Sequence, residues 1–204
     1  MYLQLDSLTP DQVYFTLIQS LVPRPIAWVL TQNSNQSYNL APFSFFNAVC
    51  SDPPLIMLSL GKKPNGSLKD TLINIEQNRC FTVHIAHREL LPALNQSSAS
   101  LKYGESELDD LNLELCEFDQ HPLPRIKCCR VAYACECYEI HSLGNTPQRI
   151  IYGKVNQCYF DDTVVTVSEQ GRVKLHADRL DPIARLGANE YAGLGKIIQL
   201  ARPK

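Results

Sequence analysis

The run NLAPFSFFNAV (39–49) combines residue types that ordinary strands and loops keep apart. Its three phenylalanines are large and apolar, whereas Ser44 and Asn47 carry hydrogen-bonding side chains. This mixture suits a flat, apolar ligand with one polar edge, because an aromatic side chain can border the ring while extended backbone offers N–H and C=O groups to the edge. Pro42 removes one donor and stiffens the chain. An edge strand whose aromatic side chains enter the core is the alternative interpretation.

A second candidate binding feature is the segment SLKDT, which places Ser67, Lys69 and Thr71 in the first turn of a predicted helix. Free backbone N–H groups and the helix dipole favour anions at such a turn, and the lysine adds a positive charge. Asp70 would repel a phosphate, so we expect it to turn back and cap the helix. An ordinary capped helix is the alternative. Together, a planar-ring site and a phosphate site suggest a mononucleotide-like cofactor.

Other catalytic and metal-binding patterns are missing from the sequence. It contains no GxGxxG dinucleotide loop, no GxxxxGK[ST] phosphate loop and no GxSxG nucleophile elbow. His84 and His87 lie three residues apart across the end of a predicted strand, so we expect them to point to opposite faces. None of the eight cysteines forms a CxxC pair, so we expect reduced, buried thiols and no metal site. We predict no catalytic acid, base or nucleophile.

The composition is that of an ordinary globular protein, with 204 residues of which 45% are hydrophobic and 20% charged. This length supports one domain over residues 1–204, and a split into two domains is the alternative. A net charge of −2 and the lack of a Lys/Arg-rich run argue against a nucleic-acid surface. No segment approaches the ~20 apolar residues that span a bilayer, and the N-terminus lacks a secretory signal pattern. We therefore expect a soluble, cytoplasmic protein.

The hydrophobic pattern predicts many strands and few helices. The first helix should begin after Thr9 as N-cap, with Gln12 completing a capping box, and end near Ser20. Trp28 should lie in the core, within a hairpin over 28–39. Further strands are predicted over 55–60, 80–87, 129–140, 149–160, 163–167 and 171–175, helices over 67–78 (capped by Ser67) and 89–95, and turns with a short helix over 180–195. This pattern favours a closed or nearly closed β-barrel over a doubly wound parallel sheet.

Several segments, taken in order, resemble the flavin reductase-like family of FMN-binding split barrels. They are RPIAWVLT, NLAPFSFFN with the DPP that follows it, KDT, and ARLGANEYAGLG. The resemblance covers about residues 21–195. It implies a mainly β fold with flanking helices, built as a six-stranded Greek-key split β-barrel. It also implies a homodimer that binds FMN at or near the subunit interface.

The resemblance further implies roles for individual residues. The backbone of residues 41–44 would line the isoalloxazine ring, Lys69 and Thr71 would hold the phosphate, and the C-terminal R-x-G-x-x-x-Y pattern would complete the pocket. His84 and Cys50 replace an asparagine and a serine that are frequent in the family, and either could tune the flavin or simply fill space. The full set implied for cofactor binding is Thr31, Ala41, Pro42, Phe43, Ser44, Asn47, Lys69, Thr71, Arg185 and Tyr191.

The activity implied by this resemblance is that of an NAD(P)H-dependent flavin oxidoreductase. NADH or NADPH would transfer a hydride to flavin N5, and the electrons would pass to free flavin, an oxygenase partner or another acceptor. Hydride transfer requires no protein acid or base, which agrees with the missing catalytic motifs. The alternatives are an FMN electron carrier reduced by a protein donor without nicotinamide, a non-enzymatic ligand-binding barrel, and a split barrel acting on a pyridoxine phosphate.

Overall fold

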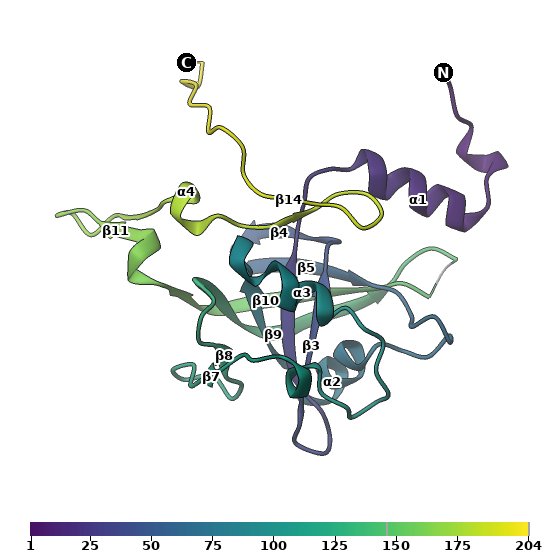
Figure 1. Cartoon of the computed structure of the whole chain (residues 1–204), viewed down its shortest axis with the longest axis horizontal. Helices are drawn as coiled ribbons and strands as arrows, with labels where there is room; N and C mark the ends of the chain where they lie inside the picture. The colour runs from purple at the N-terminus through teal and green to yellow at the C-terminus, as the bar shows by residue number, and fades with distance from the viewer. Residues whose placement is uncertain (146, 204) are drawn as a thin grey trace.

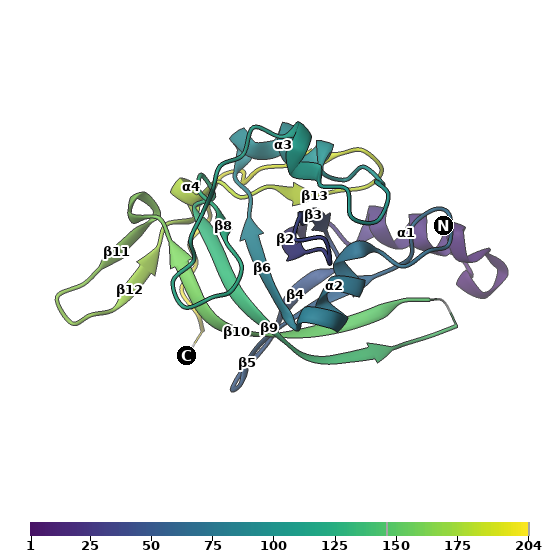
Figure 2. The ribbon, with the colours of Figure 1, turned by 90° about the horizontal axis from the view of Figure 1, so that it is seen from below.

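Seven antiparallel strands form the main sheet of the computed structural model, which describes residues 1–145 and 147–203 (Figure 1). Their order is β3-β2-β6-β9-β10-β5-β4, so the consecutive strands β3 and β4 lie at opposite edges. A bend at Ser44 and Phe45 joins these two strands, and the sheet curls accordingly (Figure 2). The bounds are β2 (Ala27–Gln32), β3 (Tyr38–Phe43), β4 (Phe46–Ser51), β5 (Pro54–Leu60), β6 (Cys80–Ile85), β9 (Val131–Ser142) and β10 (Arg149–Phe160).

Short helices and small strands surround this sheet. Helix α2 (Asp70–Asn78) packs against one face, and α3 (Leu91–Gln96) packs against the other (Figure 2). The remaining helices are α1 (Pro10–Ser20) and α4 (Ala177–Leu180), with 3-10 turns at Leu5–Ser7, Arg88–Leu90, Glu107–Asp110 and Asp162–Val164. The remaining strands are β1 (Arg24–Pro25), β7 (Leu115–Cys116), β8 (Arg125–Ile126), β11 (Val165–Val167), β12 (Val173–Leu175), β13 (Ala184–Arg185) and β14 (Tyr191–Ala192).

Strand β2 is shared by two hydrophobic cores because successive side chains point to opposite faces of a sheet. Ala27 and Val29 pack in the core that contains α2. Trp28 and Leu30 pack in the core that contains α3. The predicted core position of Trp28 is confirmed, and its indole N–H donates to Ser97 Oγ at 2.8 Å. The strand that leads into the Ser44 bend is therefore held from both sides.

Two local predictions near the N-terminus are confirmed. Thr9 Oγ1 accepts the N–H of Gln12 at 3.3 Å, and the Gln12 side chain accepts the N–H of Thr9 at 2.9 Å, which is the predicted capping box. Helix α1 ends at Ser20 as expected. The hairpin is also confirmed, because β2 and β3 pair with Thr31 opposite Asn39.

The mainly β split-barrel fold is likewise confirmed, with seven strands in the main sheet instead of six. The predicted cap of α2 is wrong. The N-cap residue of α2 is Lys69, and no side chain caps the helix. Ser67 instead bonds to Asn65 Oδ1 through its hydroxyl at 2.7 Å and its N–H at 3.0 Å. This local turn keeps Ser67 outside the helix.

The expected short helix in the C-terminal segment is also wrong. Strands β13 and β14 pair with each other, and β13 also pairs with β1, where Arg185 lies opposite Arg24. A distant strand thus supplies the backbone hydrogen bonds that a helix would make locally. The helix α4 lies earlier, before Asp181.

All eight cysteines carry free thiols, but only Cys129, Cys135 and Cys137 are buried. Three others are exposed, so the expectation of buried cysteines holds only for part of the set. No helix within the described residues is long and apolar enough to cross a membrane. Over the same part of the chain, no three His, Cys, Asp or Glu side chains gather as they would around a metal ion.

Candidate functional site

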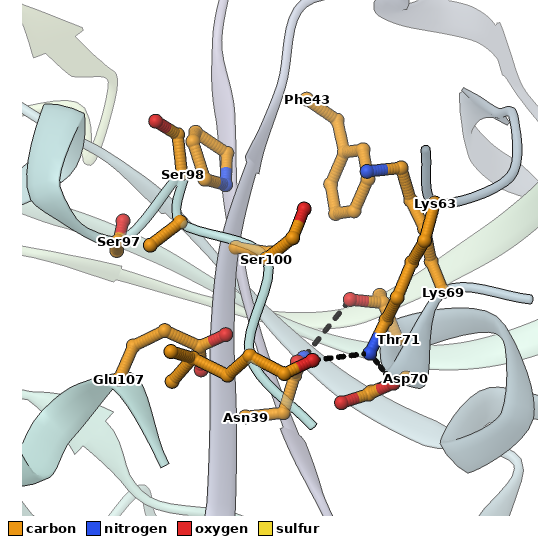
Figure 3. A pocket seen from close by; sticks show the side chains of 14 residues that line it. Asn39, Phe43, Lys63, Lys69, Asp70, Thr71, Ser97, Ser98, Ser100 and Glu107 are labelled. Atoms are coloured by element: carbon orange, nitrogen blue, oxygen red, sulfur yellow. Dashed lines mark hydrogen bonds and ion pairs between the residues drawn. The ribbon is translucent and has the colours of Figure 1, made fainter. Parts of the chain in front are cut away.

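A cavity of about 150 Å³ lies between β3, the start of α2 and the segment that follows α3. Figure 3 shows Lys69 and Thr71 on one side of this cavity and Ser98 and Glu107 on the other. Ammonium and hydroxyl groups thus converge on a small space with apolar side chains at its border. The residues that line it include Asn39, Ala41, Pro42, Phe43, Lys63, Lys69, Asp70, Thr71, Ser98, Ser100 and Glu107.

Lys69 provides the main positive charge that is available to a ligand here. Its Nζ lies 5.8 Å from the centroid of the Phe43 ring. Burial, and to a smaller extent the charge of Lys63, lower the pKa of Lys69 from its usual value. A partly desolvated ammonium is stabilised by an incoming anion. Since Lys69 is also the N-cap residue of α2, such an anion would lie near the unpaired N–H groups of the helix start.

Thr71 is held in place by a buried hydrogen-bond network. Asn39 Nδ2 donates to Thr71 Oγ1 at 2.9 Å and to Thr31 Oγ1 at 3.2 Å. Asn74 Nδ2 donates to Thr31 Oγ1 at 3.0 Å and to Asn33 Oδ1 at 2.8 Å. These five side chains are at most 3% exposed. Because the Thr71 oxygen already accepts a bond, its hydroxyl proton can be donated to a ligand.

Lys63 and Asp70 form an ion pair at the edge of the cavity. Lys63 Nζ lies 2.5 Å from Asp70 Oδ1 and donates to the Leu101 carbonyl at 2.9 Å. The prediction that Asp70 caps α2 is wrong, because this lysine takes its carboxylate. The pair neutralises Asp70, so its repulsion of an anion beside Lys69 is reduced. It also fastens the segment after α3 to the start of α2.

Glu107 is the second carboxyl group of the cavity. Its Oε2 accepts the N–H of Leu40, on the free edge of β3, at 2.8 Å. Burial is the main cause that raises the pKa of Glu107 to about 7, and the Asp70 charge adds to it. The hydrogen bond from Leu40 and the charge of Lys63 act in the opposite direction.

Two further cavities adjoin the first one at Pro42, which lines all three. One, of about 250 Å³, is bordered by Tyr14, Ser44 and Arg185. The other, of about 360 Å³, is bordered by Tyr14, Ser44 and Lys69. A ligand that is anchored beside Lys69 can therefore extend along the end of β3 into a wider space.

Arg24 fixes the bend at which these cavities meet. Its Nε donates to Ser44 Oγ at 3.3 Å, and its other nitrogens donate to the carbonyls of Leu21 and Leu186 at 2.8 Å each and to that of Ile18. The guanidinium thus joins the end of α1, the C-terminal segment and the bend. Its burial lowers the pKa of Arg24, with a smaller contribution in the same direction from Arg185.

Arg185 and Tyr191 are brought to the same wall by the pairing of β13 with β14. The Arg185 guanidinium lies 4.4 Å from the centroid of the Tyr191 ring and donates to the Ala188 carbonyl. The Tyr191 hydroxyl donates to Asn95 Oδ1 at 3.0 Å. The C-terminal segment therefore contributes to the cavity within a single chain.

The structure brings most of the residues implied by the resemblance together and leaves two apart. Thr31 lies behind the cavity wall, within the network that holds Thr71. Asn47 lies exposed on β4, and its Oδ1 accepts the N–H of Ala48 at 2.8 Å. The first cavity contains Ala41, Pro42, Phe43, Lys69 and Thr71, and the adjoining cavities contain Ser44, Arg185 and Tyr191. Their roles toward a ligand stay predictions.

Several residues of the cavities were missed in the sequence. The segment SSAS after α3 is a run of small polar residues, and this pattern could have indicated a hydroxyl-rich wall. Arg24 belongs to the quoted RPIAW segment, but nothing in that segment indicates its partners. The missed residues are Tyr14, Arg24, Lys63, Ser98, Ser100 and Glu107.

Neither of the two residues that depart from the family pattern, His84 and Cys50, lines these cavities. His84 is fully buried, with Nδ1 3.1 Å from the Trp28 carbonyl and Nε2 accepting the N–H of Ile126 at 2.9 Å. Burial lowers the pKa of His84 to about 4, so the ring is neutral. Cys50 is exposed on β4, with Sγ 3.1 Å from the Pro53 carbonyl. His84 thus has a structural role.

The donor set fits a phosphate monoester attached to a flat ring. An ammonium, a threonine hydroxyl with a free proton and a helix start suit the anion. Pro42 and Phe43 border the path from there into the wider cavities. The fold and the site therefore define a split β-barrel with a cavity suited to a phosphorylated, ring-containing cofactor.

A family described as "Flavin reductase like domain" matches residues 19–173, and the chain belongs to this family. The uncharacterized protein YwrF of Bacillus subtilis is 36% identical over 204 residues, which cover 98% of each chain. The solved structure of nitrilotriacetate monooxygenase component B from Bacillus cereus is 30% identical, has a TM-score of 0.89 and covers 98% of each chain. That of the 2-nitrobenzoate 2-nitroreductase NbaA from Pseudomonas fluorescens is 27% identical, has a TM-score of 0.86 and covers 100% of this chain and 96% of that one. The chemistry of the class is flavin-linked oxidation and reduction.

Proposed function

We propose that this protein is an FMN-binding NAD(P)H:flavin oxidoreductase. The observation that carries the proposal is the meeting of three cavities at Pro42, with Lys69 and Thr71 at one end and wider space at the other. A phosphate at the narrow end would direct the attached ring toward the bend between β3 and β4. The ammonium and hydroxyl groups at the narrow end favour a mononucleotide over a free isoalloxazine ring.

Each part of the cofactor would meet a different group of this chain. Lys69 and Thr71 would bind the phosphate, and the backbone of residues 41–44 would contact the polar edge of the ring. Arg24 would hold Ser44 in place, because their hydrogen bond ties the bend to α1. When bound, the flavin supplies the hydride and electron chemistry. The protein positions the ring and limits the access of water.

The nicotinamide donor would enter through the wider cavities. Tyr14 borders both of them, and its ring lies 6.3 Å from that of Phe45. Arg185 offers a positive charge in one of them to the anionic part of NADH or NADPH. The similarity to a monooxygenase component supports an oxygenase partner or free flavin as the acceptor.

A homodimer is part of the same proposal. Helix α1 exposes the apolar side chains of Phe15 and Leu17, and the C-terminal tail exposes Ile198 and Leu200. Figure 1 shows this tail extending away from the sheet. A second copy of the chain would bury these apolar side chains. Light scattering coupled to size exclusion should then give twice the mass of one chain, and a single-chain mass would contradict the dimer.

The visible absorption spectrum of the purified protein, with FMN added and the excess removed, is the primary test. A retained and shifted flavin band is expected, followed by turnover with NADH or NADPH in the presence of free FMN. A bound flavin without turnover by either nucleotide would replace the proposal by an electron carrier that a protein donor reduces. A spectrum without a flavin band would overturn the proposal and favour a barrel for another ligand.

A further inference from the structure

Glu107 occupies a place in the first cavity that the proposed function does not explain. Its side chain is 8% exposed, and it faces the cavity that contains Lys69 and Thr71 (Figure 3). A carboxylate at this position would weaken the binding of any phosphate there. Among the described residues, the one hydrogen bond to its carboxylate from another residue comes from the neutral N–H of Leu40. In the described part of the chain, no lysine, arginine or histidine forms an ion pair with it.

The protonation state of Glu107 determines the net charge of the first cavity. Lys63 is committed to Asp70, at 2.5 Å, so these two side chains cancel. Lys69 and Glu107 are the charged groups that remain, and they also cancel when the carboxyl is ionised. When the carboxyl is protonated, the cavity has a net positive charge. Of the two states, the protonated one favours the dianion of a phosphate monoester more strongly.

We propose that Glu107 takes up a proton from solvent when a phosphate monoester binds beside Lys69, and that the neutral carboxyl then faces the anion. This inference rests on the proposed function, because it assumes that the ligand is FMN. Glu107 is a positioning residue in this scheme, since its protonation state determines how well the cavity accepts the phosphate. No bond other than that to the proton is formed or broken.

The pH dependence of FMN affinity follows from a comparison of the pKa of Glu107 in the free protein with its pKa when the phosphate is bound. In the free protein this pKa is about 7. A bound phosphate raises it further, because two negative charges repel each other. The contribution of Glu107 therefore makes the affinity for FMN highest below pH 7, and the affinity falls as the pH rises through 7. One coupled proton limits the fall to about tenfold per pH unit.

Calorimetric titration of the whole protein with FMN at pH 8, in two buffers of different ionisation enthalpy, measures the protons taken up. At this pH the phosphate is already a dianion, because its second pKa is about 6. We expect a large fraction of one proton to be taken up per FMN and none per riboflavin, which has no phosphate. In Glu107→Gln, which keeps an oxygen to accept the Leu40 N–H, the uptake should vanish. This variant should also bind FMN several-fold more tightly than the wild type at pH 8.

Each other outcome overturns the inference in a recognisable way. FMN binding without proton uptake, or with proton release, would show that the carboxyl stays ionised. Uptake that persists in Glu107→Gln would assign the proton to Lys69, whose pKa is also lowered. Failure of the wild type to bind either flavin would overturn the proposed function itself, and the inference with it. Equal affinity of wild type and Glu107→Gln across pH 6.5–8.5 would show that Glu107 only secures β3.

Discussion

Removal of the two groups that would hold a phosphate should weaken FMN binding much more than riboflavin binding. Lys69→Ala removes the available ammonium of the first cavity, and Thr71→Ala removes a hydroxyl whose proton is free. A hydrogen bond to a charged group contributes about 1.5–3 kcal/mol. Since Lys69 is only partly buried, we expect about 2–4 kcal/mol for the double variant. This loss corresponds to a Kd for FMN that is roughly 30 to 900 times higher.

Fluorescence titration with FMN and with riboflavin, on the wild type and on each single and double variant, measures the effect. Riboflavin is the matched control, because it carries the ring and the ribityl chain without the phosphate. Its Kd should change by less than about threefold, which is under ~0.7 kcal/mol. Asn39 still has Thr31 as an acceptor in Thr71→Ala, so the network should persist, and thermal unfolding of each variant checks this.

Three results would contradict the reasoning in whole or in part. An unchanged Kd for FMN in the double variant would show that the phosphate binds elsewhere. An equal loss for FMN and riboflavin would show that the variants distort the ring site, and that the first cavity does not distinguish a phosphate. A loss confined to Thr71→Ala would assign the binding to the threonine and would remove Lys69 from the site.

Further predictions concern stability and its dependence on pH. His84 has a pKa of about 4 in the folded chain and about 6.5 when unfolded, so its contribution to stability is fully present above pH 6.5 and is lost as the pH falls toward 4. Relative to His84→Asn, the wild type should lose about 3 kcal/mol of unfolding free energy over this interval in urea titrations, and parallel pH profiles would contradict the buried neutral ring. Lys63→Met leaves Asp70 buried without its partner, which should cost about 3–5 kcal/mol, and the double variant Lys63→Met, Asp70→Leu should recover more than half of this loss. Equal losses in the single and double variants would show that the unpaired charge is not the cause.

The sequence by itself determined the elements whose causes are local. The capping box of Thr9 and Gln12 needs only residues three apart, so the start of α1 could be predicted from them. The hairpin and the buried strands follow from alternation and turn residues in the same short stretches. The segments that carry the family resemblance also indicated part of the first cavity, since Pro42, Lys69 and Thr71 all line it.

The tertiary structure alone decided which charged and polar groups pair. Asp70 has its own helix N-terminus beside it, yet its carboxylate is bound to Lys63, because a buried carboxylate is better stabilised by a cation than by a cap. Glu107 comes from a segment that reads as an ordinary polar loop, and only the edge of β3 brings its carboxyl into the cavity. Burial changes the charge of such groups through neighbours that are distant in the chain, and no local pattern of residues contains that information.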